Sequence, residues 1–267
     1  MQDMPQLGIG TFRLEDDTAH KAVVDALKVG FRHVDTAQIY GNEEQVGDAI
    51  RTQNIDRDDV FITTKVWFDH FGNDSFIASV HESLAKLKVD YVDLLLVHWP
   101  SPHDKVPMEQ YLNSLKQAKD EGLTRHIGVS NFTIAQMEKA VEILGEGEIY
   151  TNQVELHPYM QNRGVAERAE ELGMKVTAYM PFAVGKVMDS DVLKDIGNKF
   201  NATPAQVTLA WMKNKGYHTI PSSTNPDHIK DNFEFDKVKL SDEDMERIGE
   251  LDNGERIVDP DFGPEWD

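Results

Sequence analysis

Short apolar segments rich in β-branched residues alternate along the chain with longer segments of helical period. The run LLLV at residues 94–97 is apolar at every position, which is typical of a strand covered on both faces. Eight strands are expected, at residues 6–12, 31–37, 59–67, 91–99, 123–131, 150–156, 174–181 and 217–223. The pattern therefore indicates a buried parallel sheet with helices packed against it.

The segments between these strands carry apolar residues three or four positions apart. Ala22, Val23, Ala26 and Leu27 share one helical face in the first of them. Thr133 is a candidate N-cap for a later helix, because its hydroxyl can accept from the free amides of a first turn. Two further helices are expected beyond the eightfold count, at residues 190–200 and 241–252.

Eight strand–helix units in 267 residues predict a (β/α)8 TIM barrel, formed by a single domain over residues 1–267 with extra helices near the C-terminus. An open doubly wound sheet is the structural alternative. That fold usually carries a glycine-rich phosphate loop after its first strand, and the candidate GIGTF at 8–12 lacks the third glycine.

Charge and composition narrow the class of protein. With 27 basic and 47 acidic residues the net charge is −20, which argues against binding to nucleic acid or to an anionic membrane surface. No apolar run approaches the ~20 residues of a membrane span, and the N-terminus lacks a secretory pattern. The chain has no cysteine, so a cytoplasmic location is expected.

Polar and aromatic side chains gather where the expected strands end, which is where barrel enzymes carry their chemistry. In chain order they are Asp35, Tyr40, Lys65, Trp67, His98, Trp99, Ser130, Asn131, Gln153, Glu155, Tyr179, Ser222 and Ser223. Each alone could cap a helix or face solvent. Separate structural roles do not explain why consecutive units carry such groups at the same end.

Several motifs resemble the successive signatures of the aldo-keto reductase family. They are GFRHVDTAQIYGNEEQVGDAI, ITTKVW, YVDLLLVHWP, HIGVSNF, TNQVELHPY, AYMP and IPSS followed by NPDHIKDN. Within the family the chain is similar to bacterial reductases of 2,5-diketo-D-gluconate and of ketoaldehydes such as methylglyoxal. That likeness rests on HWPSP (98–102), NATPAQV (201–207), IPSST (220–224) and PEWD (264–267).

The resemblance implies NADPH-dependent reduction of a small-molecule carbonyl substrate, with Tyr40 as proton donor and Asp35, Lys65 and His98 as its partners. A free phenol has a pKa of about 10, which is too high for an efficient acid at neutral pH. A lysine ammonium within hydrogen-bond reach would stabilise the phenolate, so Lys65 is expected to lower the pKa of Tyr40. Asp35 would keep Lys65 charged and oriented, and His98 would donate to the carbonyl oxygen of the substrate. Phe12, Trp67, His98 and Trp99 are the expected substrate-binding residues.

The resemblance also assigns a cofactor site. The expected NADPH-binding residues are Thr11, Phe12, Asp35, Ser130, Asn131, Gln153, Tyr179, Met180, Pro181, Phe182, Ser222, Ser223, Thr224, His228, Asp231 and Asn232. Many family members carry Lys and Arg for the 2′-phosphate where this chain has Ser222 and His228. We therefore expect a preference for NADPH that is weaker than in those relatives.

Three other functions fit parts of the pattern. One is a non-catalytic regulatory barrel that binds a nicotinamide nucleotide. Another is an aldolase that uses Lys65 as a Schiff-base amine. The third is a metal hydrolase built on Asp35, His98 and His157, whose spacing in the chain matches no ligand motif. No metal is expected, and barrel reductases of this type are often monomers.

Overall fold

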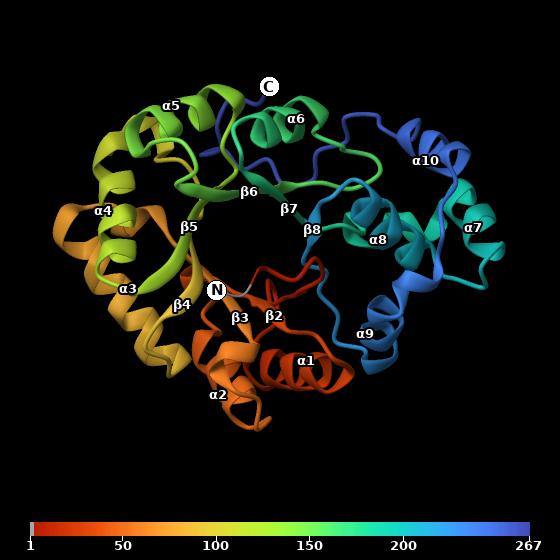
Figure 1. Cartoon of the computed structure of the whole chain (residues 1–267), viewed down its shortest axis with the longest axis horizontal. Coiled ribbons are helices and arrows are strands. Elements are labelled where there is room, and N and C mark those ends of the chain that lie inside the picture. Colours follow the sequence, from red (N-terminus) through yellow and green to blue (C-terminus); the bar gives the residue numbers. More distant parts are fainter. Residues whose placement is uncertain (1–2) are drawn as a thin grey trace.

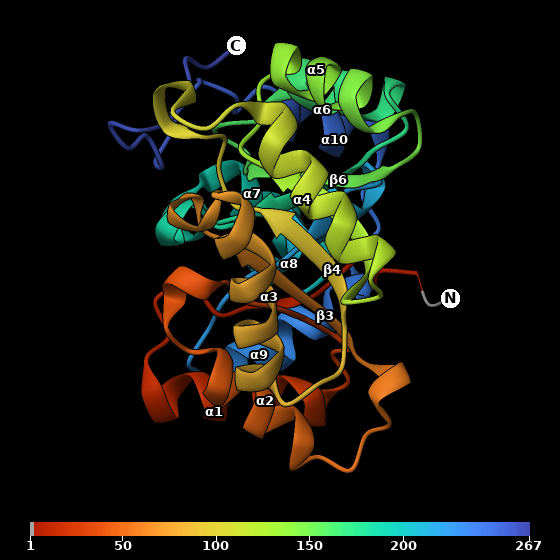
Figure 2. The same ribbon diagram turned by 90° about the vertical axis from the view of Figure 1, so that its left-hand side faces the viewer.

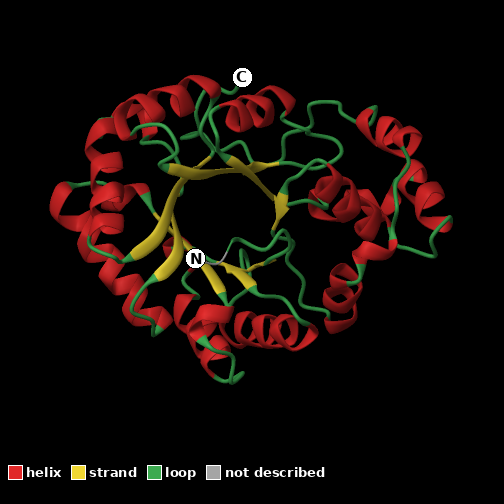
Figure 3. Cartoon of the chain, in the orientation of Figure 1, coloured by secondary structure: helices red, strands yellow, loops and turns green. Residues whose placement is uncertain are grey.

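Eight parallel strands follow one another around a ring, in the order of the chain. The computed structural model describes residues 3–267, so residues 1–2 of the predicted domain lie outside it. The strands are β1 (Ile9–Gly10), β2 (His33–Asp35), β3 (Phe61–Val66), β4 (Val92–Val97), β5 (Thr124–Ser130), β6 (Ile149–Glu155), β7 (Lys175–Tyr179) and β8 (His218–Thr219). Figure 1 is viewed down the axis of the barrel, and Figure 3 shows the strands inside and the helices outside.

The two ends of the sheet are brought together by main-chain contacts. Ladder pairing runs from β1 to β8, and Leu7 forms an isolated parallel bridge with Thr219. The amide of Gly8 donates to the Thr219 carbonyl over 2.8 Å, and the Thr219 amide donates to the Gln6 carbonyl over 2.7 Å. An α/β barrel is therefore confirmed. The doubly wound alternative is wrong, since the strand order never reverses.

Helices form the outer layer. They are α1 (Asp16–Val29), α2 (Glu43–Arg51), α3 (Asn73–Leu87), α4 (Met108–Asp120), α5 (Ile134–Leu144), α6 (Arg163–Glu171), α7 (Asp191–Asn198), α8 (Pro204–Asn214), α9 (Pro226–Phe233) and α10 (Asp242–Gly249). The extra helices predicted at 190–200 and 241–252 correspond to α7 and α10. Thr133 caps α5 as predicted, in a reciprocal capping box with Gln136.

The continuous apolar run of β4 is explained by its two buried faces. Leu95 and Val97 belong to the large core between the strands and the helices. Leu94 and Leu96 belong to a small cluster with Phe61 and Met4. Successive strand residues point to opposite faces, so only a strand buried on both sides needs apolar residues at every position.

The two ends of the barrel differ in what lies against them. Figure 2 shows the N-terminal residues on one side and the C-terminal segment that follows α10 on the other. Within residues 3–267 no helix is long and apolar enough to cross a membrane.

Candidate active site

Four of the predicted polar side chains meet where strands β2, β3 and β4 end. Asp35 is the last residue of β2, Lys65 is the penultimate residue of β3, and His98 follows β4 directly. Tyr40 ends η1 (Gln38–Tyr40), the short 3-10 helix that follows β2. Asp35 and Lys65 are almost completely buried, at 1% and 0% exposed, so their charges must be satisfied by each other and by nearby polar groups.

Lys65 is the centre of this group. Its Nζ forms an ion pair with Asp35 Oδ1 and donates to the Thr36 carbonyl over 2.9 Å. It also lies 3.4 Å from the hydroxyl oxygen of Tyr40. Asp35 Oδ2 accepts a hydrogen bond of 2.9 Å from Gln153 Nε2. One ammonium group therefore holds the carboxylate and the phenol in a fixed relation.

Burial dominates the electrostatics of the ion pair. It raises the pKa of Asp35, while the charge and hydrogen bond of Lys65 lower it. Burial also lowers the pKa of Lys65, against the charge of Asp35. Each charge thus favours the other, and removal of either residue leaves an uncompensated group in the interior.

Tyr40 differs from the sequence-based expectation. Burial and the negative charge of Asp35 raise the pKa of its phenol well above the ordinary value, whereas Lys65 was expected to lower it. Burial is the larger of the two causes, because a phenolate away from water loses its hydration. Tyr40 is therefore a protonated phenol at neutral pH, which is the form that can give up a proton.

His98 is held as a neutral imidazole. Burial, with a contribution from the charge of Lys65, lowers its pKa well below 6.5. Its ring lies edge-on to the rings of Tyr40 and Trp67, with centroids 5.5 and 5.3 Å away. Nδ1 is buried and has no hydrogen-bond partner among the described residues. A neutral ring with its proton on the other nitrogen, Nε2, fits this environment.

A second polar group adjoins the first on strands β5, β6 and β7. Tyr179 donates from its hydroxyl to Asn131 Oδ1 over 2.8 Å, and Asn131 Nδ2 donates to the His98 carbonyl over 3.1 Å. Ser130 Oγ donates to the Gln153 carbonyl over 2.8 Å. Asn131 has a positive φ of 61°, a conformation that asparagine tolerates. The structure therefore brings these four predicted cofactor residues together beside Asp35.

The predicted cofactor residues near the N-terminus also adjoin the site. Thr11 donates from its hydroxyl to the Asp35 carbonyl over 3.0 Å. The ring of Phe12 lies 5.2 Å from that of Tyr40 and is 44% exposed. Phe12 is thus available to a ligand, while Thr11 holds the end of β2.

The remaining predicted cofactor residues lie on two segments after β7 and β8. Met180 has a φ of 51°, and Pro181 and Phe182 lead into the 3-10 segment η5 (Ala183–Asp189). Between β8 and α9 lie Ser222, Ser223 and Thr224, and α9 carries His228, Asp231 and Asn232. Across the described residues, no hydrogen bond links the residues of these two segments to Asp35, Tyr40, Lys65 or His98.

Part of the aromatic surface beside His98 was not predicted from the sequence. The centroid of the Phe262 ring lies 5.8 Å from the ring centroid of Trp67, 5.4 Å from that of Trp99 and 5.1 Å from that of Phe68. Trp266 lies 6.0 Å from Trp99. The only sequence signal was the terminal PEWD, which carries no indication that it folds back over the strand ends.

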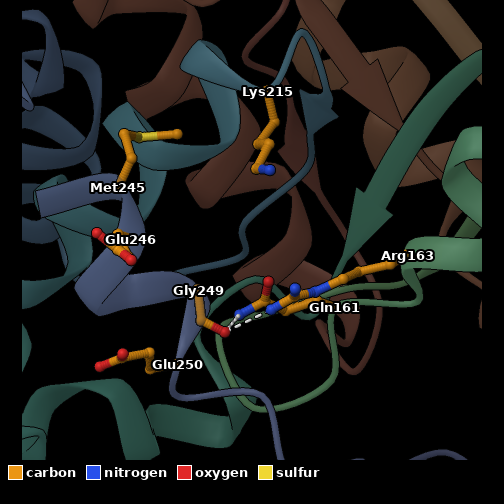
Figure 4. A pocket seen from close by; sticks show the side chains of 7 residues that line it. All are labelled: Gln161, Arg163, Lys215, Met245, Glu246, Gly249 and Glu250. Carbon is orange, nitrogen blue, oxygen red and sulfur yellow. Dashed lines mark hydrogen bonds between the residues drawn. The ribbon is translucent and has the colours of Figure 1, made fainter. Parts of the chain in front are cut away.

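One surface pocket is distinct from this site. A surface pocket of about 470 Å³ lies among α6, α8 and α10, where Gln161 and Arg163 both donate to the Gly249 carbonyl (Figure 4). None of the predicted site residues lines that pocket. Throughout residues 3–267 no group of three or more histidine or acidic residues is arranged to hold a metal ion. His157 pairs instead with Glu155, over 2.9 Å.

Comparisons with known proteins agree with this arrangement. Residues 6–253 match the Aldo/keto reductase family. The chain is 48% identical over 265 residues to methylglyoxal reductase DkgB of Escherichia coli O157:H7, with 99% of each chain covered. It is 36% identical over 267 residues to methylglyoxal reductase DkgA of Escherichia coli K12, covering 97% of this chain and 94% of that one. A crystal structure provisionally named 2,5-diketo-D-gluconic acid reductase B is similar with a TM-score of 0.95 at 45% identity, covering 99% of this chain and 94% of the other.

Proposed function

Because the chain belongs to the Aldo/keto reductase family and is an NAD(P)H-dependent oxidoreductase, we propose that it reduces small ketoaldehydes to alcohols with NADPH. Methylglyoxal and 2,5-diketo-D-gluconate are the proposed substrates, since similar proteins carry those names. One observation carries the mechanism: Lys65 Nζ contacts both the carboxylate of Asp35 and the hydroxyl of Tyr40.

Tyr40 is the proposed proton donor. Its raised pKa keeps the phenol protonated, and an alkoxide is a much stronger base than a phenolate, so the proton passes to the product oxygen. Lys65 then stabilises the phenolate left on Tyr40, because its ammonium is 3.4 Å away. Asp35 keeps Lys65 charged and prevents it from turning away.

His98 is proposed to orient the substrate. A neutral imidazole with its proton on Nε2 donates a hydrogen bond to the carbonyl oxygen without supplying a competing acid. Trp67, Trp99 and Phe12 are the proposed walls of the substrate site. The aromatic contacts of Trp67 and Trp99 with Phe262 support a small, largely apolar enclosure around one polar centre.

The residues present fit a nicotinamide cofactor. Ser130, Asn131 and Gln153 offer the hydroxyl and amide groups that a carboxamide requires, and Tyr179 offers a flat ring fixed by its bond to Asn131. The segment before α9 offers hydroxyls for phosphate. At the start of α9 Pro226 has no amide hydrogen and the Asp227 amide donates to Asn225 Oδ1, so the next amide is that of His228. When bound, NADPH supplies the hydride that the substrate carbon receives.

Four broader predictions accompany this function. The family implies a closed (β/α)8 barrel, which the hydrogen bonds between residues 6–8 and Thr219 support. A single domain over residues 1–267, a monomer and a cytoplasmic location remain predictions.

A carbonyl-substrate panel run with NADPH and with NADH tests the proposal. We expect turnover of methylglyoxal with NADPH. Binding of NADPH without turnover of any carbonyl compound would favour the regulatory barrel instead. Recovery of a borohydride-trapped adduct on Lys65 would favour the aldolase.

A further inference from the structure

Glu155 is a buried carboxylate that the proposed mechanism does not use. It ends β6 and is 0% exposed, two residues beyond Gln153. Its Oε1 accepts from the Ile257 amide over 2.7 Å and from His157 Nε2 over 2.9 Å. Its Oε2 accepts from the Val258 amide over 2.7 Å. Both oxygens are thus occupied by donors, two of which belong to the C-terminal end of the chain.

These donors keep the carboxylate ionised. Burial raises the pKa of Glu155, but the hydrogen bonds from His157, Ile257 and Val258 lower it by more, so the net pKa lies below its ordinary value. A buried charge is tolerated only where such donors hold it. The main-chain amides at 257 and 258 are therefore tied to β6 through charge-assisted hydrogen bonds.

Residues 256–267, called here the tail segment, are fastened at further points. The guanidinium of Arg256 lies 3.7 Å from the centre of the Trp266 ring, which folds the tail segment back on itself. Trp266 Nε1 donates to Asp259 Oδ1 over 2.8 Å. At the far end, Asp267 Oδ2 accepts from the Ile134 amide at the start of α5, also over 2.8 Å.

The tail segment carries Phe262 to the substrate side of the site. Its ring contacts Trp67 and Trp99, and Trp67 in turn lies 5.3 Å from His98. Glu155 holds positions 257 and 258, a few residues before Phe262. Movement of the tail segment away from β6 would therefore remove one wall beside Trp67 and Trp99, while Asp35, Tyr40 and Lys65 keep their own contacts.

We propose that Glu155 is a positioning residue that holds the tail segment over the substrate site and thereby sets the affinity for the carbonyl substrate. This inference rests on the proposed function. Two residues of β6 then have different roles. Gln153 donates to Asp35 beside the proposed cofactor site, and Glu155 binds the tail segment that covers the substrate site.

Glu155→Gln tests the inference, because the amide has nearly the same shape but loses the charge and one acceptor. We expect the KM for methylglyoxal to rise by about tenfold, the factor that a lost charged hydrogen bond supplies. The kcat should change far less, and the Kd for NADPH, measured by quenching of tryptophan fluorescence, should stay the same. A fall in kcat with unchanged KM would overturn the inference.

Two further variants separate this role from a general effect on stability. Phe262→Ala should reproduce the rise in KM, and its combination with Glu155→Gln should cost little more than either alone, since both act through one wall. Glu265→Gln, which changes an exposed carboxylate of the same segment, should leave KM as it is. Full additivity of the first two variants would contradict the proposal.

Hydrogen exchange provides a readout that does not depend on turnover. In the wild type the amides of Ile257 and Val258 should be protected, and Glu155→Gln should speed exchange across residues 256–267 but not in β2 or β3. Rapid exchange at both amides in the wild type would contradict the proposal that Glu155 holds them. If the wild type reduced no carbonyl compound, the proposed function would fail, and exchange would still decide whether Glu155 holds the tail segment.

Discussion

Gln153 Nε2 donates a hydrogen bond of 2.9 Å to Asp35 Oδ2, joining β6 to β2 across 118 positions of sequence. The other oxygen of Asp35 pairs with Lys65, whose Nζ lies 3.4 Å from the Tyr40 hydroxyl oxygen. Asp35 therefore links a proposed cofactor residue to the proposed proton donor. Three hydrogen bonds connect Gln153 to Tyr40: one from Gln153 to Asp35, one from Lys65 to Asp35 and one from Lys65 to Tyr40.

Tyr40→Phe removes the proposed acid and leaves the ring in place. We expect kcat for methylglyoxal to fall by at least ~10²-fold, as for the loss of a general acid. The Kd for NADPH should not change, because the lost hydroxyl contacts Lys65. Steady-state kinetics and tryptophan quenching measure the two quantities. Turnover equal to the wild type in Tyr40→Phe would rule out this role.

Lys65→Met should abolish most reduction and also weaken the fold, because Asp35 is left as an unpaired buried charge. The free energy of unfolding should fall by roughly 3–5 kcal/mol, as for other broken buried pairs. Denaturant titration measures the loss. The double variant Asp35→Asn with Lys65→Met should regain most of the stability and none of the activity. A double variant no more stable than Lys65→Met would show that the ion pair does not account for the loss.

His98 should not limit activity near neutral pH. Its pKa is lowered well below 6.5 by burial and by the charge of Lys65, so the ring stays neutral as the pH falls through 6.5. Loss of the neutral form, and of the activity that depends on it, should begin only at distinctly lower pH. The profile of kcat/KM against pH checks this. An inflection near 6.5 that disappears in His98→Gln would contradict it.

Ser222→Lys should strengthen NADPH binding and leave NADH binding unchanged. The 2′-phosphate distinguishes the two cofactors, and a charged hydrogen bond contributes about 1.5–3 kcal/mol against about 0.5–1.5 for a neutral one. The Kd for NADPH should therefore fall by roughly tenfold. Lys239→Ser is the control for an effect of the net charge of the protein on cofactor binding. It should alter neither the Kd for NADPH nor the Kd for NADH appreciably. Equal tightening of both cofactors by Ser222→Lys would place position 222 away from the 2′-phosphate.

His33 should make the protein less stable in acid. Burial, with the charges of His218 and Lys65, lowers its pKa to about 3. An unfolded histidine has a pKa near 6.5, so between about 6.5 and 3 the unfolded state binds a proton that the folded state excludes. The free energy of unfolding should therefore decline as the pH falls from about 6.5 to about 3. His33→Asn should flatten the decline, whereas His81→Asn, at an exposed position, should not. Identical pH slopes in the wild type and His33→Asn would refute this.

The sequence by itself determined the alternation of strands and helices, the strand order that follows from it, and the four catalytic candidates. Periodicity is local, so Thr133 could be recognised as a cap and α7 and α10 could be expected from their own residues. The placement of Asp35, Lys65 and His98 at strand ends followed as well, because parallel strands bring their carboxyl ends to one edge.

Only the tertiary structure decided what surrounds those residues. The raised pKa of Tyr40 depends on burial and on the negative charge of Asp35 nearby, which no spacing in the chain reveals. Phe262 and Trp266 reach Trp67 and Trp99 because Glu155 binds two main-chain amides about a hundred positions away. Main-chain amides have no identity in a sequence, so a contact made through them is invisible until the chain has folded.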